Sequence, residues 1–429
     1  MAARIALVAG VRTPFLKAGS VARELPAYEL GRQALVALQA RLNLKAGTVD
    51  EVVFGCVANP PNAANVARVI ALRAGLDRAI PARTVSRNCA SGMEAITAAA
   101  EKILAGQSSV AVVGGAESMS QAPLLWPQAF AFLLDDWRRA KTLGAKWSVL
   151  RRLRPALFTP RVGLLEGLTD PVCGMNMGQT AEVLAREFGL SRAAQDAFAC
   201  ESHRRAEAAT ASGRLAEEIV PLYVPPRYEP IAADNGIRPG QTVEALARLR
   251  PFFDARWGTV TAGNSSQITD GAVALLVTTE ERAQAEGWAP LGYLRAWAYA
   301  GLDPRRMGLG PVFATARALD RASLTLADVE LAEINEAFAA QVLACLAAFE
   351  SPKFAADELG RGAALGRLDP ARLNVNGGAI ALGHPVGASG ARLALTLLLE
   401  MRRRGLGLGL AALCIGGGQG AALLFEGAR

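Results

Sequence analysis

The first and last thirds of this chain contain the same three sequence elements in the same order. In the first third, a small-residue loop at 89–92 opens a helix pattern, and a strand pattern at 110–113 then ends at a glycine pair. In the last third, a similar loop at 387–390 opens a helix pattern through Arg404, and a strand pattern at 410–414 ends in three glycines. This order predicts two similar halves that each contribute a loop to a shared cleft.

Strand and helix patterns alternate within both thirds. The sequence predicts a strand at 4–9, a helix at 27–42 and strands at 51–55 and 330–334. Alternation of this kind favours an α/β fold with largely buried sheets. A chain of 429 residues exceeds one ordinary core, so two or three domain-sized units are expected.

The stretch 121–249 differs from both halves. It holds most of the irregular, Pro-containing and Trp-containing segments, together with amphipathic helix patterns at 181–188 and 193–210. We interpret it as an inserted helical loop domain. The expected division is an N-terminal half at 1–120 and 250–280, the insertion at 121–249, and a C-terminal half at 281–429.

The basic charge of the chain lies in one segment. The formal net charge is +7, yet the segment 137–161 carries eight cations and no acidic residue, so the remainder has a net charge of −1. Nucleic acid is therefore excluded as a partner, because no recognition motif accompanies the patch. Trp, Leu and Phe interleave with Arg over 126–161, which suits an anionic membrane surface; a solvated face or a partner-docking surface fits equally well.

Cysteine and histidine usage excludes other classes of site. None of the six cysteines forms a C-x-x-C pair and the chain has two histidines, which argues against a zinc site and a disulfide scaffold. The sequence shows no charged-then-apolar leader and no 18-residue uncharged apolar run. We expect a cytoplasmic protein, with any membrane association confined to 126–161.

Two residues stand out as candidate reactive groups. Cys89 precedes a helix, where the helix dipole and free N–H groups stabilise a thiolate, although a buried structural cysteine is the commoner role. His384 lies in a glycine-dense loop, where an imidazole can take a thiol proton or donate to an oxyanion. The second histidine, His203, lies in a polar helix pattern and is expected at the surface.

Three further positions fit the same cleft. Cys414 ends a strand at a glycine turn whose bare backbone, starting at Gly416, could offer N–H groups to a carbonyl oxygen. Asn335 follows the strand pattern at 330–334 and could hold a water molecule or a carbonyl group. A simple strand-exit turn is the alternative interpretation of the glycines.

Together, these segments resemble the thiolase family over essentially the whole chain. The matching blocks, in order, are Arg12-Thr13-Pro14-Phe15, Cys89-Ala90-Ser91-Gly92, 259–266 with Asp270-Gly271-Ala272, Asn335-Glu336-Ala337-Phe338, Gly383-His384-Pro385, and Cys414 with its glycines. The resemblance implies a five-layered αβαβα fold of two duplicated halves with an inserted loop domain. It also implies assembly as homodimers or dimers of dimers.

The resemblance also implies site roles, with coenzyme A (CoA) and acyl-CoA as substrates and neither a bound cofactor nor a metal. Cys89 matches the nucleophile that carries the acyl group, His384 its base, and Cys414 the acid/base at the α-carbon of acetyl-CoA. Asn335 matches the residue that positions an oxyanion-hole water, and the N–H groups of Cys89 and Gly416 match a second oxyanion hole. The positions near the pantetheine arm are Ser266, Met177 and Phe338.

Within the family, the long 126–161 stretch resembles the helical insertion of the β-subunit of the fatty-acid-oxidation trifunctional complex. That likeness implies a hydratase/dehydrogenase α-subunit as partner and 3-ketoacyl-CoA thiolysis in β-oxidation. Two positions differ from residues that are common in the family. Asn335 stands where those β-subunits commonly carry His, and Asn176 stands where many short acetoacetyl-CoA thiolases carry a His near the CoA arm. An acetoacetyl-CoA thiolase working in the condensing direction, and a noncatalytic acyl-CoA or lipid carrier, remain alternatives.

Overall fold

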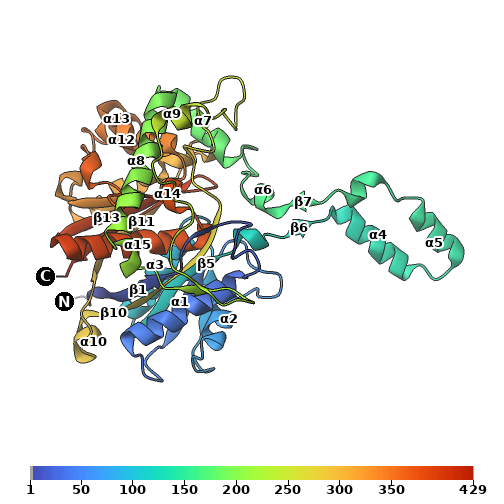
Figure 1. The fold of residues 1–429 in the computed structure, drawn as a ribbon, viewed down its shortest axis with the longest axis horizontal. Helices are drawn as coiled ribbons and strands as arrows, with labels where there is room; N and C mark the ends of the chain where they lie inside the picture. Colours follow the sequence, from blue (N-terminus) through green and yellow to red (C-terminus); the bar gives the residue numbers. More distant parts are fainter. Residues whose placement is uncertain (1–2, 429) are drawn as a thin grey trace.

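The computed structural model describes residues 3–428, and a ten-stranded sheet runs through its centre (Figure 1). The strand order is β12-β13-β14-β11-β1-β10-β5-β3-β4, and β2 pairs with β10. The strands are β1 (Ile5–Arg12), β2 (Leu16–Lys17), β3 (Glu51–Gly55), β4 (Ala82–Val85), β5 (Val110–Glu117), β10 (Thr269–Thr279), β11 (Gly292–Gly301), β12 (Leu331–Ile334), β13 (Leu408–Ile415) and β14 (Gln419–Gly427).

The pairing pattern of the sheet confirms the predicted duplication. In one half β3 and β5 are parallel, while β5–β10 and β10–β1 are antiparallel. In the other half β12 and β13 are parallel, while β13–β14 and β14–β11 are antiparallel. The halves meet where three residues of β1 pair with β11, and each of these strands has a register shift just beyond that junction.

Helices complete five layers. α3 (Ser91–Leu104) and α15 (Val386–Arg404) pack together between the two halves of the sheet (Figure 1). α1 (Ala27–Leu42) and α2 (Val66–Arg73) cover the outer face of the first half. α11 (Gly310–Ala322) and α12 (Ala339–Glu350) cover the outer face of the second. The αβαβα expectation is therefore confirmed.

The period-two alternation of the strands explains why both faces of the sheet are covered. In β10, Val273 and Leu275 point into the central core with α3 and α15, whereas Ala274 and Leu276 point into the outer core with α1. α15 is buried on nearly all sides because its first turns are built from small residues at 387–391.

The strand predicted at 110–113 does not end at the glycine pair that follows it, as the sequence analysis expected. Gly114 and Gly115 lie inside β5, which continues to Glu117. A Cβ on Gly114 would lie 2.0 Å from the carbonyl oxygen of Val273, and one on Gly115 would lie 2.0 Å from that of Gly387. The glycines permit this close backbone approach, and the strand places Glu117 at the cleft.

The chain between β5 and β10 has two parts. The predicted helices at 181–188 and 193–210 correspond to α7 (Met177–Glu187) and α8 (Arg192–Ala211), which pack on the body. Residues 124–162, here called the arm, project away from it (Figure 1). The arm contains β6 (Leu124–Leu125), α4 (Gln128–Arg139), α5 (Leu143–Leu150), η2 (Pro155–Phe158) and β7 (Arg161–Val162).

Short elements connect the remaining parts. They are η1 (Met119–Gln121), α6 (Gly163–Gly167), η3 (Leu215–Glu217), β8 (Leu222–Tyr223), β9 (Pro230–Ile231), α9 (Val243–Ala247), α10 (Glu280–Ala285), η4 (Pro304–Leu309), η5 (Leu326–Asp328), α13 (Pro352–Leu359), η6 (Pro370–Arg372) and α14 (Ala379–Leu382). Within residues 3–428, every helix is too short or too polar to cross a membrane.

Candidate active site

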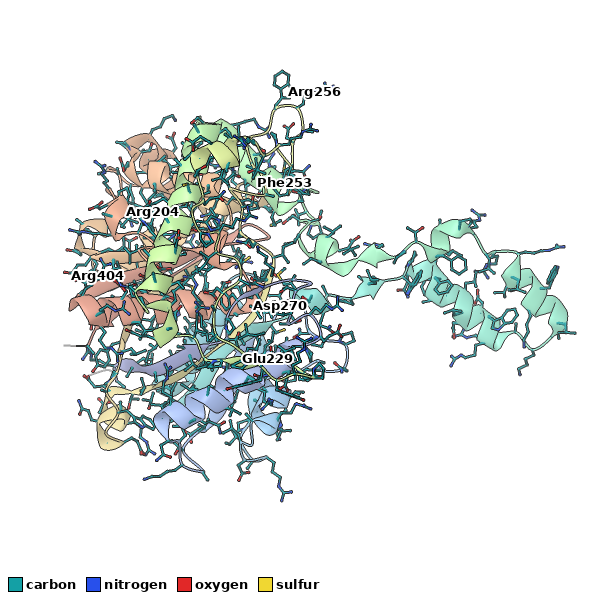
Figure 2. All side chains as sticks on the ribbon, in the orientation of Figure 1. Arg204, Glu229, Phe253, Arg256, Asp270 and Arg404 are labelled. Atoms are coloured by element: carbon teal, nitrogen blue, oxygen red, sulfur yellow. The ribbon has the colours of Figure 1, made fainter. Side chains whose placement is uncertain are left out.

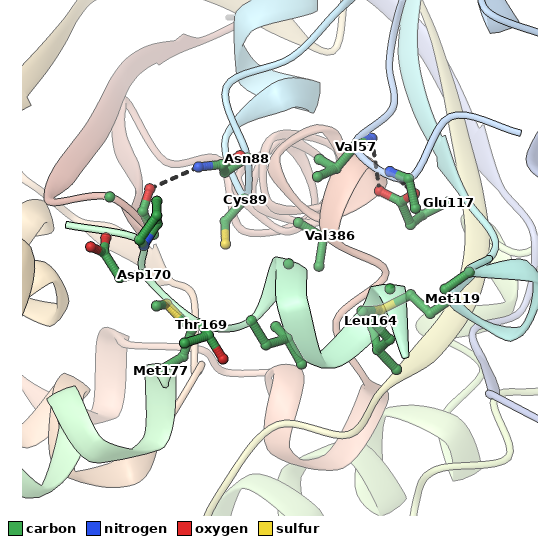
Figure 3. A pocket seen from close by; sticks show the side chains of 18 of the residues that line it. Val57, Asn88, Cys89, Glu117, Met119, Leu164, Thr169, Asp170, Met177 and Val386 are labelled. Atoms are coloured by element: carbon green, nitrogen blue, oxygen red, sulfur yellow. Dashed lines mark hydrogen bonds between the residues drawn. The ribbon is translucent and has the colours of Figure 1, made fainter. Parts of the chain in front are cut away.

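A cavity of about 620 Å³ opens beside Cys89. The Cys89 thiol points into it, with Met177 and Leu164 on the opposite wall (Figure 3). Its lining is mostly apolar, and it combines the ends of β5 and β3, the start of α15, and the segments at the root of the arm. The arm-root residues in the lining are Ala122, Pro123, Leu125, Gly163, Leu164, Gly167 and Leu168.

The two halves meet at Cys89 through backbone groups. Asn88 Nδ2 donates to the carbonyl oxygen of Gly416 at 2.8 Å, which ties the Cys89 loop to the glycine turn after β13 (Figure 3). The N–H groups of Gly416 and Cys89 itself face the thiol, and both act to lower its pKa. The structure thus brings together the two N–H groups that sequence analysis paired.

Burial outweighs those donors. Desolvation raises the pKa of the Cys89 thiol above its ordinary value, and the negative charge of Glu117 raises it further. The stabilised thiolate expected from the helix start is therefore not found, because the low-polarity surroundings dominate. Burial and the neighbouring Cys89 also raise the pKa of Cys414 well above its ordinary range. Both thiols are protonated at neutral pH, so thiolate formation needs a base.

His384 has the surroundings of such a base. Its Nδ1 lies 2.6 Å from Ser389 Oγ, and that hydroxyl also donates to the carbonyl oxygen of Pro385 at 3.0 Å. Because the hydroxyl proton is directed to Pro385, Oγ accepts from Nδ1–H and leaves Nε2 unprotonated. Burial, with a contribution from Arg392, lowers the pKa of His384 to about 4, so the imidazole is neutral at pH 7.

Asn335 lies against the same imidazole. Its Nδ2 is 3.5 Å from His384 Nε2, at the long limit of a hydrogen bond. Asn335 is fully buried, and its Oδ1 has no hydrogen-bond partner among residues 3–428. Its backbone N–H donates to Ala412, two residues before Cys414, so the ends of β12 and β13 place Asn335 beside the predicted acid/base.

The three predicted CoA-arm residues border one apolar wall. Phe338 and Met177 cluster with Cys414 and Phe253, and the ring of Phe253 meets that of Phe338 edge-on at 5.9 Å. Met177 Sδ lies 3.1 Å from where a Cβ on Gly416 would stand. Ser266 joins this wall through its N–H, which donates to Ala337 at 2.9 Å.

Comparison with known proteins identifies the family. Residues 5–281 match the domain family described as "Thiolase, N-terminal domain". Residues 288–427 match the domain family described as "Thiolase, C-terminal domain". This chain belongs to the thiolase family.

Thiolases similar to this one are known from sequence and structure. A 3-ketoacyl-CoA thiolase of Citrobacter koseri is 44% identical over 424 residues, covering 99% of this chain and 97% of that protein. The crystal structure of the Bacillus anthracis acetyl-CoA acetyltransferase superimposes with a TM-score of 0.86 at 36% identity, covering 99% of each chain. The crystal structure of human mitochondrial 3-ketoacyl-CoA thiolase in complex with CoA superimposes with a TM-score of 0.85 at 34% identity, covering 100% of this chain and 98% of that chain.

Two parts of this thiolase site were missed by sequence reasoning. Asn88 adopts a left-handed backbone (φ 45°), which Asn tolerates well, and so aims its amide at Gly416. Ser389 was treated as one residue of a small loop, although its spacing of five from His384 places it one turn into the next helix. The signal in each case was a polar residue inside a small-residue loop.

One histidine assignment was wrong. His203 is 2% exposed rather than at the surface, and its Nδ1 accepts a hydrogen bond from the N–H of Arg238 at 3.2 Å. Burial and the nearby cations lower the pKa of His203 to about 4. It lies on the inner side of α8, away from the thiolase cavity lining. Within residues 3–428, no group of three or more His, Cys, Asp or Glu side chains is placed to hold a metal ion.

Proposed function

We propose that this thiolase is an acetyl-CoA C-acyltransferase that cleaves 3-ketoacyl-CoA with CoA in fatty acid β-oxidation. The observation that carries the proposal is the thiol of Cys89, which faces two backbone N–H groups at the wall of a largely apolar cavity of about 620 Å³. The names of the 3-ketoacyl-CoA thiolase relatives support the same activity. Coenzyme A enters as a substrate, as in the CoA complex of the human relative.

In the proposed first half-reaction, His384 Nε2 accepts the Cys89 proton as the sulfur attacks the 3-keto carbon. The N–H groups of Cys89 and Gly416 stabilise the resulting oxyanion. The bond between the α-carbon and the keto carbon then breaks, and Cys414 protonates the acetyl-CoA enolate. His384 and a water molecule held by Asn335 Oδ1 hold the thioester oxygen during this step.

In the second half-reaction, the thiol of CoA attacks the acyl group on Cys89. Cys414 takes the thiol proton, and His384 returns a proton to the departing Cys89 sulfur. Ser266, Met177 and Phe338 lie along the wall that would hold the pantetheine arm. An intact-mass measurement tests the scheme: acetyl-CoA should add one acetyl group to the wild type and none to Cys89→Ala. A wild type that forms no adduct would refute catalysis and favour the acyl-CoA or lipid carrier.

The apolar cavity favours substrates longer than acetoacetyl-CoA. The walls near Cys89 include Val57, Met119, Leu125, Leu164 and Val386, which can bury methylene groups. We therefore expect kcat/KM to rise from acetoacetyl-CoA to 3-ketodecanoyl-CoA and 3-ketohexadecanoyl-CoA. Activity confined to acetoacetyl-CoA would instead support the acetoacetyl-CoA thiolase of the condensing direction.

We also propose that the arm contacts an anionic membrane surface. Its apolar side chains face solvent to an unusual degree: Leu143 is 88% exposed, Trp147 61% and Phe132 60%. Figure 2 shows the arm extending away from the body, with its side chains drawn on both sides of its helices. Four of its cations pair with carboxylates, but Lys141, Lys146, Arg151 and Arg154 have no carboxylate within 4.0 Å among the described residues. Free cations beside exposed aromatic groups suit a lipid interface.

The arm can be removed cleanly for a test. Where β6 pairs with β7 at the base of the arm, Leu125 lies directly opposite Arg161, so replacing 126–160 by Asn-Gly would close a two-residue hairpin. Wild type should co-sediment with phosphatidylserine-containing vesicles and lose that binding at high salt, whereas the shortened variant should stay in solution. Equal binding by both proteins would end the membrane proposal. Acetoacetyl-CoA thiolysis by the shortened variant reports that the fold is intact.

Assembly is the last part of the proposal. We infer homodimers or dimers of dimers from the family, and a hydratase/dehydrogenase α-subunit from the likeness of the 126–161 insertion. Light scattering of the purified chain measures the first. Co-purification with an α-subunit measures the second, and loss of that co-purification in the shortened variant would assign the arm to the partner.

A further inference from the structure

Glu117 is a buried carboxylate at the edge of the active-site cavity. It ends β5, is 1% exposed, and lines the cavity with Cys89. Its oxygens accept from the N–H groups of Val57 at 3.1 Å (Figure 3) and Ala58 at 2.9 Å, which follow β3. They also accept from the N–H group of Gly387 at 2.8 Å. One carboxylate therefore joins both halves of the molecule.

We propose that Glu117 is a positioning residue that fixes the start of α15, and through it the imidazole of His384, against the half of the molecule that carries Cys89. This proposal rests on the proposed thiolysis. Glu117 touches neither the reacting thiol nor the imidazole, so its effect on the reaction passes through the backbone.

The connection from Glu117 to the imidazole is short. Gly387 is the second residue of α15, and the carbonyl oxygen of Pro385 two residues earlier accepts from Ser389, which in turn holds His384 Nδ1. A Cβ on Gly387 would lie 2.9 Å from Glu117 Oε2 and 3.0 Å from the Cα of Cys56. The glycine thus admits the carboxylate, and a shift at Glu117 moves the turn that orients the base.

The carboxylate also has an electrostatic effect on the nucleophile. Its charge raises the pKa of Cys89, against the Gly416 and Cys89 N–H groups that lower it. Cys414, on β13, is the thiol that faces Cys89 from the other half. Cys56 Sγ donates to Glu117 at 3.7 Å, and burial raises the pKa of both Cys56 and Glu117. The effect of the Glu117 hydrogen bonds and the effect of its charge on Cys89 can therefore be separated by the choice of the residue that replaces Glu117.

Two substitutions separate them. Glu117→Asp keeps the charge but shortens the reach to Gly387. Glu117→Gln keeps the length but removes the charge and turns an NH₂ group toward N–H donors. We expect both to lower kcat at least about tenfold with little change in KM, because a misplacement near 1 Å can cost ~10²-fold. Only Glu117→Gln should move the pH midpoint of Cys89 alkylation, and it should move it to lower pH.

Glu51→Gln is the matched control. Glu51 is a buried carboxylate at the start of β3 that binds Lys102 at 2.7 Å and lies outside the cavity lining. It should lower the thermal unfolding midpoint while leaving kcat and the alkylation midpoint at wild-type values. All rates are expressed per folded enzyme from circular dichroism.

The outcomes distinguish this proposal from the function beneath it. A wild type that forms no acetyl adduct refutes the thiolase function itself. A wild type that acylates, with Glu117 variants that keep its kcat per folded enzyme, refutes the positioning role alone. The same refutation follows if both variants lose stability but keep the wild-type alkylation midpoint and kcat. If Glu117→Gln fails to fold, Glu117→Asp still decides: a lowered kcat with an unchanged KM supports the positioning role, and an unchanged kcat refutes it.

Discussion

His384 Nδ1 and Ser389 Oγ lie 2.6 Å apart, and the serine hydroxyl is committed to the carbonyl oxygen of Pro385. This arrangement fixes the tautomer of the imidazole with its base nitrogen, Nε2, toward Asn335. The first turn of α15 therefore sets the tautomer of the base as well as beginning the helix.

Ser389→Ala should lower kcat about tenfold to a hundredfold, because the neutral imidazole loses the acceptor that selects its tautomer. KM should change little, since Ser389 does not line the cavity. Steady-state thiolysis with 3-ketodecanoyl-CoA measures both constants. An unchanged kcat would show that the tautomer is held by other contacts.

Cys89 should be the first active-site thiol to react with iodoacetamide, and its rate should climb as the pH approaches and passes 9. Burial raises the thiol pKa, so little thiolate exists at pH 7, and Cys414 is both only 1% exposed and more strongly shifted. Peptide mass spectrometry across a pH series gives the rate at each cysteine. Faster labelling of Cys414 would contradict the order of the two pKa shifts.

His203→Asn should reduce the loss of stability in mild acid. The pKa of His203 is lowered from 6.5 to about 4, so well above pH 6.5 its imidazole is neutral in both folded and unfolded chains and contributes almost nothing. Below that pH His203 binds a proton in the unfolded chain but not in the folded one, which destabilises the fold by about 2 kcal/mol near pH 5. Asn can still accept from the Arg238 N–H.

Thermal unfolding of wild type and His203→Asn near pH 7 and near pH 5 checks this sign. The variant should lose less stability between the two conditions. His384 has a similarly lowered pKa and is present in both proteins, so its contribution cancels in the comparison. Parallel losses would mean that His203 titrates normally in the folded protein.

Arg392→Met should destabilise the protein by about 3–5 kcal/mol, because it leaves the buried carboxylate of Glu333 without its partner at 2.7 Å. Burial already raises the pKa of Glu333 to about 7. The double variant Arg392→Met/Glu333→Leu should recover most of the loss, since no buried charge remains. Thermal unfolding midpoints measure both, and a double variant no more stable than the single one would contradict the pairing argument.

Local patterns predicted the duplicated framework well. The helix at 27–42 and the strand at 51–55 match α1 and β3 residue for residue, because period and burial agree there. The pairing order of the sheet could not be predicted, because hydrogen bonds between strands far apart in sequence leave no local trace. The end of β5 was missed for that reason: only the backbones of Val273 and Gly387 explain its glycines.

The site residues were predictable as residue types, but not in their supporting contacts. A cysteine, a histidine and an asparagine in glycine-rich loops indicate chemistry by themselves. Glu117 carries no such sign, because its donors are N–H groups, which every residue but proline provides. The direction of the Cys89 pKa shift was also out of reach, since it depends on how completely the folded halves exclude water.

The pairing of β11 with both β1 and β14 brings the chain ends together. Leu7 and Gly427 lie on opposite sides of Gly292, each directly across from it, so they are about two strand spacings, ~10 Å, apart. A short linker could join the termini there, and new termini could be opened between α4 and α5 at the far end of the arm (Figure 1). Such a circular permutant would keep every strand pair, while β1 to β5 would be synthesised after the C-terminal half instead of before it.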